Sequence, residues 1–232
     1  RGTSNVTITG LHFIGCEPVI ASATSANIVV DNIRAKYMNH GVADLQQSHP
    51  GFGIPRKVGM PMIGPDNVVK NSEFKYSSST AIWAGPNCRI ENNLFEYINY
   101  EGNWGCPVNL YATDGGQKIL WNTMRVLGRG GVDFGWVNYP PGGQHLNVEI
   151  AYNDIGDFGR TCWDLGGTYA HGSANLNGLQ IHHNWIHDVP PPDGDDVGGM
   201  SAIYFDQSSG GGSVHHNVTW NIATSDAYHE TE

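Results

Sequence analysis

The segments IAYNDI (150–155) and IHHNWI (181–186) decide the fold, because they repeat one pattern 31 residues apart. Each has an apolar residue, two variable residues, an asparagine, one variable residue and a second apolar residue. The other copies are IENNLF (90–95), ILWNTM (119–124), the less perfect VHHNVT (214–219) and an earlier one in VVKN (68–71). Repeats at periods of about 20–50 residues indicate stacked structural units. The repeated asparagines are Asn71, Asn93, Asn122, Asn153, Asn184 and Asn217.

A second short strand is expected later in each repeat. Its copies are AIWAG (81–85), PVNLY (107–111), GVDFG (131–135), CWDLG (162–166) and AIYFD (202–206). Alternation within these strands directs apolar side chains inward and polar ones outward. Units this small cannot bury a face alone, so the sequence predicts an all-β parallel solenoid of about seven to eight coils. Asparagine suits its corners, because it tolerates left-handed backbone and its amide can bond the same amide one coil away.

The chain resembles the right-handed parallel β-helix proteins of the pectate-lyase-like superfamily, from about Asn5 to Asn221. The resemblance is closest in DLGGTYAHGSANLNGLQIHHNWIHDV (164–189) and AIYFDQSSGGGSVHHNVTWN (202–221), which are similar to the last coils of secreted carbohydrate-active proteins. It implies a right-handed helix and action on glycans. Polygalacturonase and pectate-lyase motifs are not recognisable, and one fold serves many activities, so function must be argued from the site.

One domain over residues 1–232 is expected, with loop insertions near 41–65, 97–105, 136–146 and 190–199. The coil pattern begins within the first ten residues and no capping element is evident at the other end. Because open solenoid ends expose strand edges, we expect missing flanking sequence, as in a fragment of a longer solenoid, or a capping partner.

The charge balance excludes some classes of partner. Of 232 residues, 12 are Lys or Arg and 22 are Asp or Glu, a net charge of −10 that would repel phosphate backbones, so no nucleic-acid partner is expected. No segment reaches 18 apolar residues, so membrane insertion is not expected either. Two NVT sequons, at Asn5 and Asn217, and four cysteines fit a secreted, extracellular glycoprotein with one or two disulfides.

Aligning the second strands predicts a polar row on the outer face of one sheet. The row contains Asn109, Asp133, Asp164 and Tyr204, with Asp206 two residues further along the last strand. Strand spacing of roughly 4.8 Å places the backbones of Asp133 and Asp164 about 5 Å apart, and those of Asp164 and Asp206 roughly 8 Å apart. Two carboxylates at such separations suit glycoside hydrolysis, either retaining or inverting. Asp164, Asp206 and Asp133 are therefore the candidate catalytic residues.

Arginines stand near this row. Arg129 and Arg160 each precede an aspartate of the row by four residues, so they either neutralise Asp133 and Asp164 or bind a sugar hydroxyl or carboxylate. His171 follows Asp164 by seven residues and is a candidate to bind a hydroxyl or act as a base.

Aromatic residues in the insertions could stack on sugar rings or pack over the solenoid wall. They are Phe52, Tyr100, Trp104, Trp136 and Tyr139, of which Trp104 and Trp136 join Tyr204, Asn109 and His171 as candidate substrate-binding residues.

No metal or other cofactor is expected. His182 with His215, and His183 with His216, form rows that read as structural ladders, because a third ligand is missing. The loop PPPDGDDVGG (190–199) carries Asp193, Asp195 and Asp196, which could bind calcium, but their spacing is not that of an EF-hand.

The favoured function is a glycoside hydrolase acting on an extracellular polysaccharide through the Asp164 and Asp206 carboxylates. The alternatives are a lyase or epimerase on a polyuronate, which needs a cation such as the arginines or calcium, and a non-catalytic adhesin or surface fibre. If the arginines neutralise the aspartates, neutral glycans are favoured over anionic ones.

Overall fold

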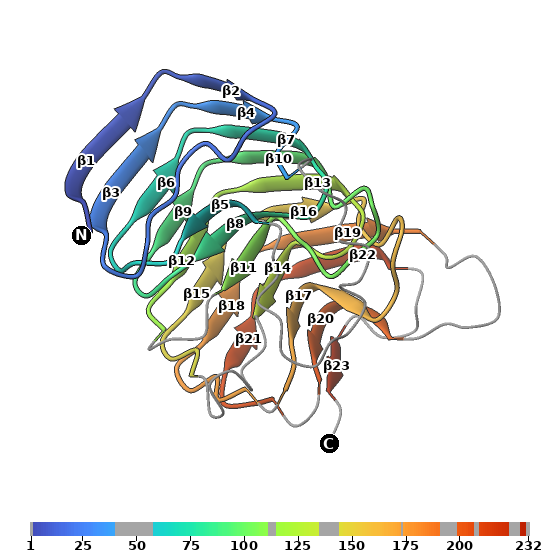
Figure 1. The fold of residues 1–232 in the computed structure, drawn as a ribbon. Coiled ribbons are helices and arrows are strands. Elements are labelled where there is room, and N and C mark those ends of the chain that lie inside the picture. The colour runs from blue at the N-terminus through green and yellow to red at the C-terminus, as the bar shows by residue number, and fades with distance from the viewer. Residues whose placement is uncertain are drawn as a thin grey trace.

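The computed structural model describes residues 2–39, 58–110, 115–134, 144–172, 174–190, 199–206, 209–222 and 228–230. These residues contain strands and no helix, and every strand pair is parallel. From β3 onward the chain visits three sheets in a fixed order, and one such pass is called a coil below (Figure 1). This all-β arrangement of stacked parallel strands is consistent with the expected solenoid. None of the described segments is a helix able to cross a membrane.

The first sheet has eight strands. They are β1 (Ser4–Thr9), β3 (Ala26–Asp31), β6 (Val68–Lys70), β9 (Arg89–Glu91), β12 (Lys118–Leu120), β15 (Glu149–Ala151), β18 (Gln180–His182) and β21 (Ser213–His215). The second sheet also has eight: β2 (His12–Ile14), β4 (Arg34–Lys36), β7 (Glu73–Ser77), β10 (Leu94–Ile98), β13 (Thr123–Leu127), β16 (Asp154–Gly156), β19 (Trp185–Val189) and β22 (Val218–Ile222).

The third sheet has seven strands, in the order β23 (Tyr228–Glu230), β20 (Met200–Phe205), β17 (Leu165–Ala170), β14 (Val132–Phe134), β11 (Val108–Leu110), β8 (Thr80–Ala84) and β5 (Val58–Met62). The expected loop at 41–65 is therefore too long, because β5 lies within it and pairs with β8. The other second strands fall close to where the repeat predicts them, except for CWDLG (162–166), where β17 begins only at Leu165.

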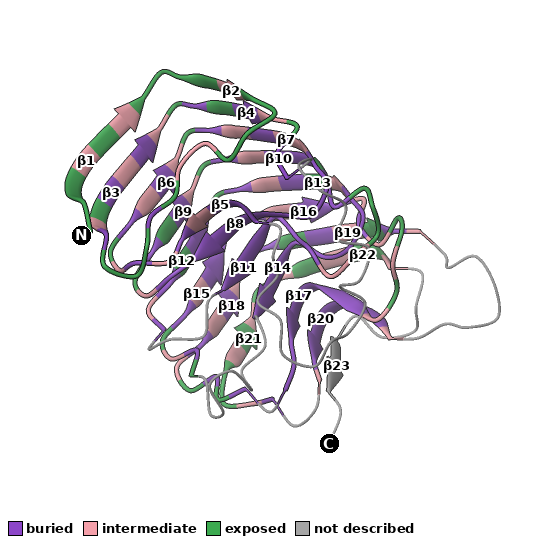
Figure 2. Ribbon diagram, viewed as in Figure 1, coloured by how far each residue is buried: buried purple, intermediate pink, exposed green. Residues whose placement is uncertain are grey.

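The core lies between the three sheets and runs along the whole stack. The inner coils contribute side chains from every sheet, as Ile90, Phe95 and Leu110 illustrate, and all three are fully buried. Figure 2 shows that β17 and β20 are buried along their whole length, whereas β1 and β2 at the N-terminal end are largely exposed. Stacking of identical units thus buries the apolar face that a single coil cannot bury.

An asparagine ladder joins the coils at the corner between the first and second sheets. The Asn93 side-chain nitrogen donates to Oδ1 of Asn122 over 3.0 Å, and the same bond links Asn122 to Asn153, Asn153 to Asn184 and Asn184 to Asn217. Each Oδ1 also accepts a hydrogen bond from the backbone N–H of the preceding asparagine in the ladder. The prediction of equivalent corner positions is confirmed for these asparagines.

Asn71 is the exception, because it lies one position outside the ladder. Ser72 takes the ladder place, and its backbone N–H donates to Oδ1 of Asn93 over 3.0 Å. Asn71 has φ of 52° and accepts a hydrogen bond from Asn92 in a separate, outer row. The left-handed conformation therefore belongs to the residue before each ladder asparagine, not to the asparagine itself as expected.

The outer row continues with larger residues. Trp121, Tyr152, His183 and His216 all have positive φ. Left-handed backbone is unfavourable for bulky residues. The rings stack on one another from coil to coil, with centroids 5.8, 5.2 and 5.0 Å apart, and this contact offsets part of the backbone cost.

Two expectations linked to secretion are changed by the structure. Cys16, Cys88, Cys106 and Cys162 are all free thiols, so the disulfides expected from their even number are not formed. Asn5 is exposed, but the Asn217 side-chain nitrogen donates to the Ile181 carbonyl over 2.9 Å within the ladder. Asn217 is also only partly exposed, so the Asn5 sequon is the more accessible of the two in the folded chain.

Candidate active site

The outer face of the third sheet carries one row of mostly polar and aromatic side chains. The paired positions are Trp83, Asn109, Asp133, Tyr169 and Tyr204, one on each of five neighbouring strands. Their sequence neighbours point into the core, as the buried pairs Val108 and Leu110 or Val132 and Phe134 show. All five side chains of the row are nevertheless buried. The outer face of the third sheet is therefore buried along this row.

The predicted place of Asp164 in this row was wrong. Tyr169 occupies the position beside Asp133, and Asp164 lies just before β17 with φ of 56°. The alignment failed because GRTCWDLG mimics the Arg-to-Asp spacing of GRGGVDFG. The correct register matches the double glycine of GGVDFG (130–135) with that of GGTYAH (166–171).

The shared glycines have a physical reason. A Cβ on Gly130 would lie 1.9 Å from the Gly166 carbonyl oxygen, and one on Gly131 would lie 2.8 Å from Cγ2 of Ile155. The backbone N–H of Gly131 donates to the Gly167 carbonyl over 3.0 Å. Side chains at these positions would separate the two coils, so the double glycine is the signal that identifies the register and hence Tyr169.

Asp133 is bound by Arg129 inside this face. The two side chains form an ion pair with an Nη1–Oδ2 distance of 2.5 Å, and their exposed fractions are only 2% and 5%. Burial is the largest single effect and would raise the pKa of Asp133, but the charge and hydrogen bond of Arg129 together with the contact to His171 outweigh it and hold that pKa below its usual value. The prediction that Arg129 neutralises Asp133 is confirmed. Asp133 is therefore an enclosed anion and a poor catalytic candidate.

Arg129 also contacts two aromatic rings and a backbone carbonyl. Its guanidinium carbon lies 4.5 Å from the ring centroid of Trp104 and 4.7 Å from that of Tyr169, so the cation is held between the two rings. Its Nη2 donates to the Asp164 carbonyl oxygen over 2.9 Å. Trp104, predicted to bind substrate, thus packs on Arg129 with its own surface half-buried.

Arg160 does not join this cluster through a salt bridge to Asp164. It forms a two-pronged salt bridge with Asp157, with both N–O distances 2.7 Å, at an exposed position after the second sheet. The expectation that Arg160 neutralises Asp164 was therefore wrong. Asp157 lies three residues before Arg160 and is thus closer in sequence to it than Asp164, which lies four residues after it.

Asp164 is half-buried at the edge of the cluster. Desolvation raises the pKa of its carboxyl group, the Arg129 charge opposes that rise, and the charge of Asp206 adds to it. Within the described part of the chain, no side chain donates a hydrogen bond to this carboxylate. Asp164 thus has the environment of a carboxylic acid that keeps its proton to higher pH than usual.

Asp206 lies in a different environment at the end of β20. The Tyr169 hydroxyl donates to its Oδ2 over 2.9 Å, and its backbone N–H donates to the Ala170 carbonyl over 2.8 Å. Burial and the Asp164 charge both raise the pKa of Tyr169, so its hydroxyl stays protonated and remains a donor. Burial, followed by the charges of Asp206 and Asp164, raises the pKa of Tyr204 to about 12. Asp206 is thus held as a hydrogen-bond acceptor.

His171 and Asn109 complete the described cluster. His171 is buried with its Nε2 3.4 Å from Oδ1 of Asp133, and its ring stacks on Tyr169 at 5.1 Å. Asn109 accepts a hydrogen bond from the indole N–H of Trp83 over 2.6 Å. His171 therefore faces Asp133 rather than overhanging an open sheet, and Asn109 is already engaged by Trp83. Sequence reasoning missed both Tyr169 and Trp83.

Several predicted residues lie outside the described residues. These are Trp136, Phe52, Tyr139 and the loop aspartates Asp193, Asp195 and Asp196. Tyr100 is exposed.

Elsewhere on the surface, a shallow groove crosses the corner between the first and second sheets. It is lined by residues such as Arg34, Glu73, Trp121 and Arg125. This groove contains no member of the carboxylate cluster on the third sheet.

The histidine rows form as predicted. His182 stacks on His215 and His183 on His216, in both cases with ring centroids 5.0 Å apart and nearly parallel planes. Among the described residues, no group of three or more His, Cys, Asp or Glu side chains is arranged to hold one metal ion.

Comparisons with protein-family models, with curated proteins and with solved structures found no significant match for this chain. The functional argument therefore rests on the geometry of the third sheet.

Proposed function

We propose that the chain is a secreted carbohydrate-active enzyme of the right-handed parallel β-helix type, and specifically a glycoside hydrolase acting on an extracellular polysaccharide. The observation that carries this proposal is the difference between the environments of two neighbouring carboxylates. Asp164 has a raised pKa and Asp206 accepts a hydrogen bond from Tyr169. A carboxyl group that keeps its proton beside a carboxyl group that accepts a hydrogen bond is the arrangement that acid–base catalysis at a glycosidic bond requires.

The roles follow from these environments. Asp164, as the protonated member, gives its proton to the glycosidic oxygen while the bond from that oxygen to the anomeric carbon breaks. Asp206, as the member that accepts a hydrogen bond from Tyr169, either takes a proton from the water that attacks the anomeric carbon or attacks that carbon itself and is later released by water. Tyr169 positions Asp206, and Arg129 positions Asp164 through its carbonyl. The reaction needs no cofactor.

The charges around this pair favour a neutral glycan. A lyase or epimerase for polyuronates must bind a carboxylate on each sugar, and Arg129 and Arg160 were the cations proposed for that purpose. Arg129 is already paired with Asp133 and Arg160 with Asp157. Polyuronate chemistry is therefore the less supported alternative.

The test is a pair of isosteric substitutions, Asp164→Asn and Asp206→Asn, assayed for release of reducing ends from polysaccharides. Each should lower turnover by about 10²–10⁴-fold, because the amide keeps the shape and loses the proton transfer. Asp31→Asn is the matched control, since Asp31 ends β3 on the first sheet and is bonded to Asn71. Wild-type turnover in both site variants would overturn the assignment and favour a non-catalytic glycan-binding or structural role.

A further inference from the structure

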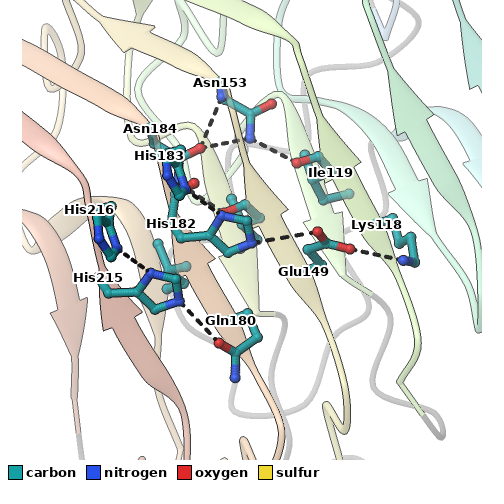
Figure 3. A network of polar contacts seen from close by, with 12 residues as sticks. Lys118, Ile119, Glu149, Asn153, Gln180, His182, His183, Asn184, His215 and His216 are labelled. Carbon is teal, nitrogen blue, oxygen red and sulfur yellow. Dashed lines mark hydrogen bonds and ion pairs between the residues drawn. The ribbon is translucent and has the colours of Figure 1, made fainter.

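Four imidazoles gather at the corner after the first sheet (Figure 3). They form two rungs, one above the other. In the first rung Nδ1 of His182 lies 2.9 Å from Nδ1 of His183, and in the second Nδ1 of His215 lies 2.8 Å from Nδ1 of His216. The two nitrogens of each rung share one hydrogen bond, and they are directed towards each other at a separation that two ligands of one metal ion can also have.

In each rung one histidine, His182 or His215, is the inner one, and its Nε2 lies close to a hydrogen-bond acceptor; His183 and His216 are the outer histidines. Nε2 of His182 lies 3.5 Å from Oε1 of Glu149, whose Oε2 accepts from Lys118 over 2.9 Å. Nε2 of His215 lies 3.3 Å from Oε1 of Gln180. We therefore assign the ring proton of His182 and of His215 to Nε2, which leaves on each Nδ1 a lone pair that accepts the hydrogen bond from the other histidine of the rung. A metal-binding histidine typically gives its second N–H to a carboxylate or carbonyl in this way.

The outer histidines are held by stacking. The ring of His183 lies between Tyr152, at 5.2 Å, and His216, at 5.0 Å. His183 and His216 are exposed residues. Each can move its proton from Nδ1 to Nε2 through solvent without any change in charge. Both Nδ1 atoms of a rung then present lone pairs.

We propose that this four-histidine corner binds Cu²⁺, one ion per rung, through the two Nδ1 atoms of the rung. With metal–nitrogen distances of about 2.0 Å, a separation of 2.8–2.9 Å gives an N–metal–N angle of about 90°. That angle is the cis angle of a square-planar ion, whereas tetrahedral zinc needs nitrogens about 3.3 Å apart. Copper also binds nitrogen ligands most strongly among the divalent first-row ions. Water completes each coordination shell.

The two rungs do not share one ion, since their rings are 5.0 Å apart. Two dications at that distance repel each other. The first copper ion therefore binds more tightly than the second. This site is independent of the carboxylate cluster on the third sheet.

The experiment is a titration of the untagged protein with Cu²⁺ alone, followed by calorimetry and by electron paramagnetic resonance. Wild type should give a tight first equivalent whose spectrum shows coupling to two nitrogens. The double variant His183→Ala/His216→Ala removes one exposed ligand from each rung and should weaken that equivalent at least tenfold. Glu149→Gln should weaken it about tenfold, as loss of an outer carboxylate does.

The matched control is His12→Ala, because His12 is an exposed histidine on β2 outside the corner. This variant should bind Cu²⁺ as wild type does. A double variant with circular dichroism and first-equivalent affinity equal to those of wild type would overturn the proposal. So would a first equivalent without coupling to two nitrogens, or zinc binding as tight as copper binding.

Discussion

Arg129 connects both proposed catalytic carboxylates to the fold. It pairs with Asp133, lies against the Tyr169 ring that holds Asp206, and donates to the carbonyl of Asp164. A buried ion pair contributes little net stability compared with apolar residues of the same volume, because both charges must leave water. The pair therefore makes physical sense as a device that fixes the positions of Tyr169 and Asp164.

Breaking this pair should be costly. Asp133→Ala leaves the Arg129 guanidinium buried without its anion, so the free energy of unfolding should fall by about 3–5 kcal/mol. Urea denaturation followed by fluorescence measures it. The double variant Arg129→Met/Asp133→Leu should recover most of the loss in stability but not activity. Equal stability of Asp133→Ala and wild type would show that the pair is not desolvated as described.

The proton on Asp164 should set the alkaline limit of activity. Because its pKa is raised in the folded protein, the donor form persists at low pH and is lost as pH rises through that pKa. A profile of kcat/KM against pH should therefore fall on the alkaline side at a pH above the usual range of an aspartate. Asp164→Asn should remove that limb from its residual activity, whereas Asp31→Asn should keep it. An unchanged alkaline limb in Asp164→Asn would assign the proton to another group.

The asparagine ladder shows which elements a repeat can predict. Asn93, Asn122, Asn153 and Asn184 were placed correctly because each satisfies the same backbone groups in every coil. Asn71 was misplaced by one residue because a serine hydroxyl can replace the ladder amide, and Ser72 does so. An asparagine pattern alone cannot separate the ladder position from the left-handed position beside it.

The ladder also predicts a difference between its middle and its end. Asn153→Ala removes buried bonds to the Asn122 N–H and the Ile119 carbonyl, and should lower the free energy of unfolding by about 2–5 kcal/mol. Asn217→Ala should cost about 1 kcal/mol, because Asn217 is half-buried and water can replace its bonds. Thermal unfolding of the two variants measures the difference. Equal losses would contradict the view that the ladder stabilises through buried bonds.

The sequence predicted which residues of the third-sheet strands face outward, but it did not predict how those strands pair. Alternation identified Asn109, Asp133 and Tyr204 as outward residues, and the structure places all three in one row. It could not exclude CWDLG as the strand next to GVDFG, since both alternate equally well. The pairing was decided by close backbone contact at Gly130 and Gly166, which no pattern of apolar residues reports.

The three sheets of the molecule differ in what their outer faces can do. Aromatic rings at the first two sheets stack on one another, as Tyr37 does on Tyr76 and Trp121 on Tyr152. A sugar needs a free ring face, so this stacking reduces the number of ring faces that a glycan could use. The third sheet instead brings Asp164, whose pKa is raised, close to Asp206 and to a cation that is already neutralised, in a protein of net charge −10. The proposed chemistry on a neutral glycan is therefore assigned to this one face.

The chemistry of the product tests this claim most directly. Hydrolysis leaves a reducing end without unsaturation, whereas elimination leaves a conjugated double bond that absorbs in the ultraviolet. We therefore propose incubating the wild-type protein with a panel of neutral and uronate polysaccharides, with and without a chelator. We expect reducing ends from a neutral polysaccharide at a rate that the chelator does not change, and no new ultraviolet absorbance. Chelator-sensitive growth of that absorbance on a uronate polymer would contradict the account and establish a metal-assisted lyase instead.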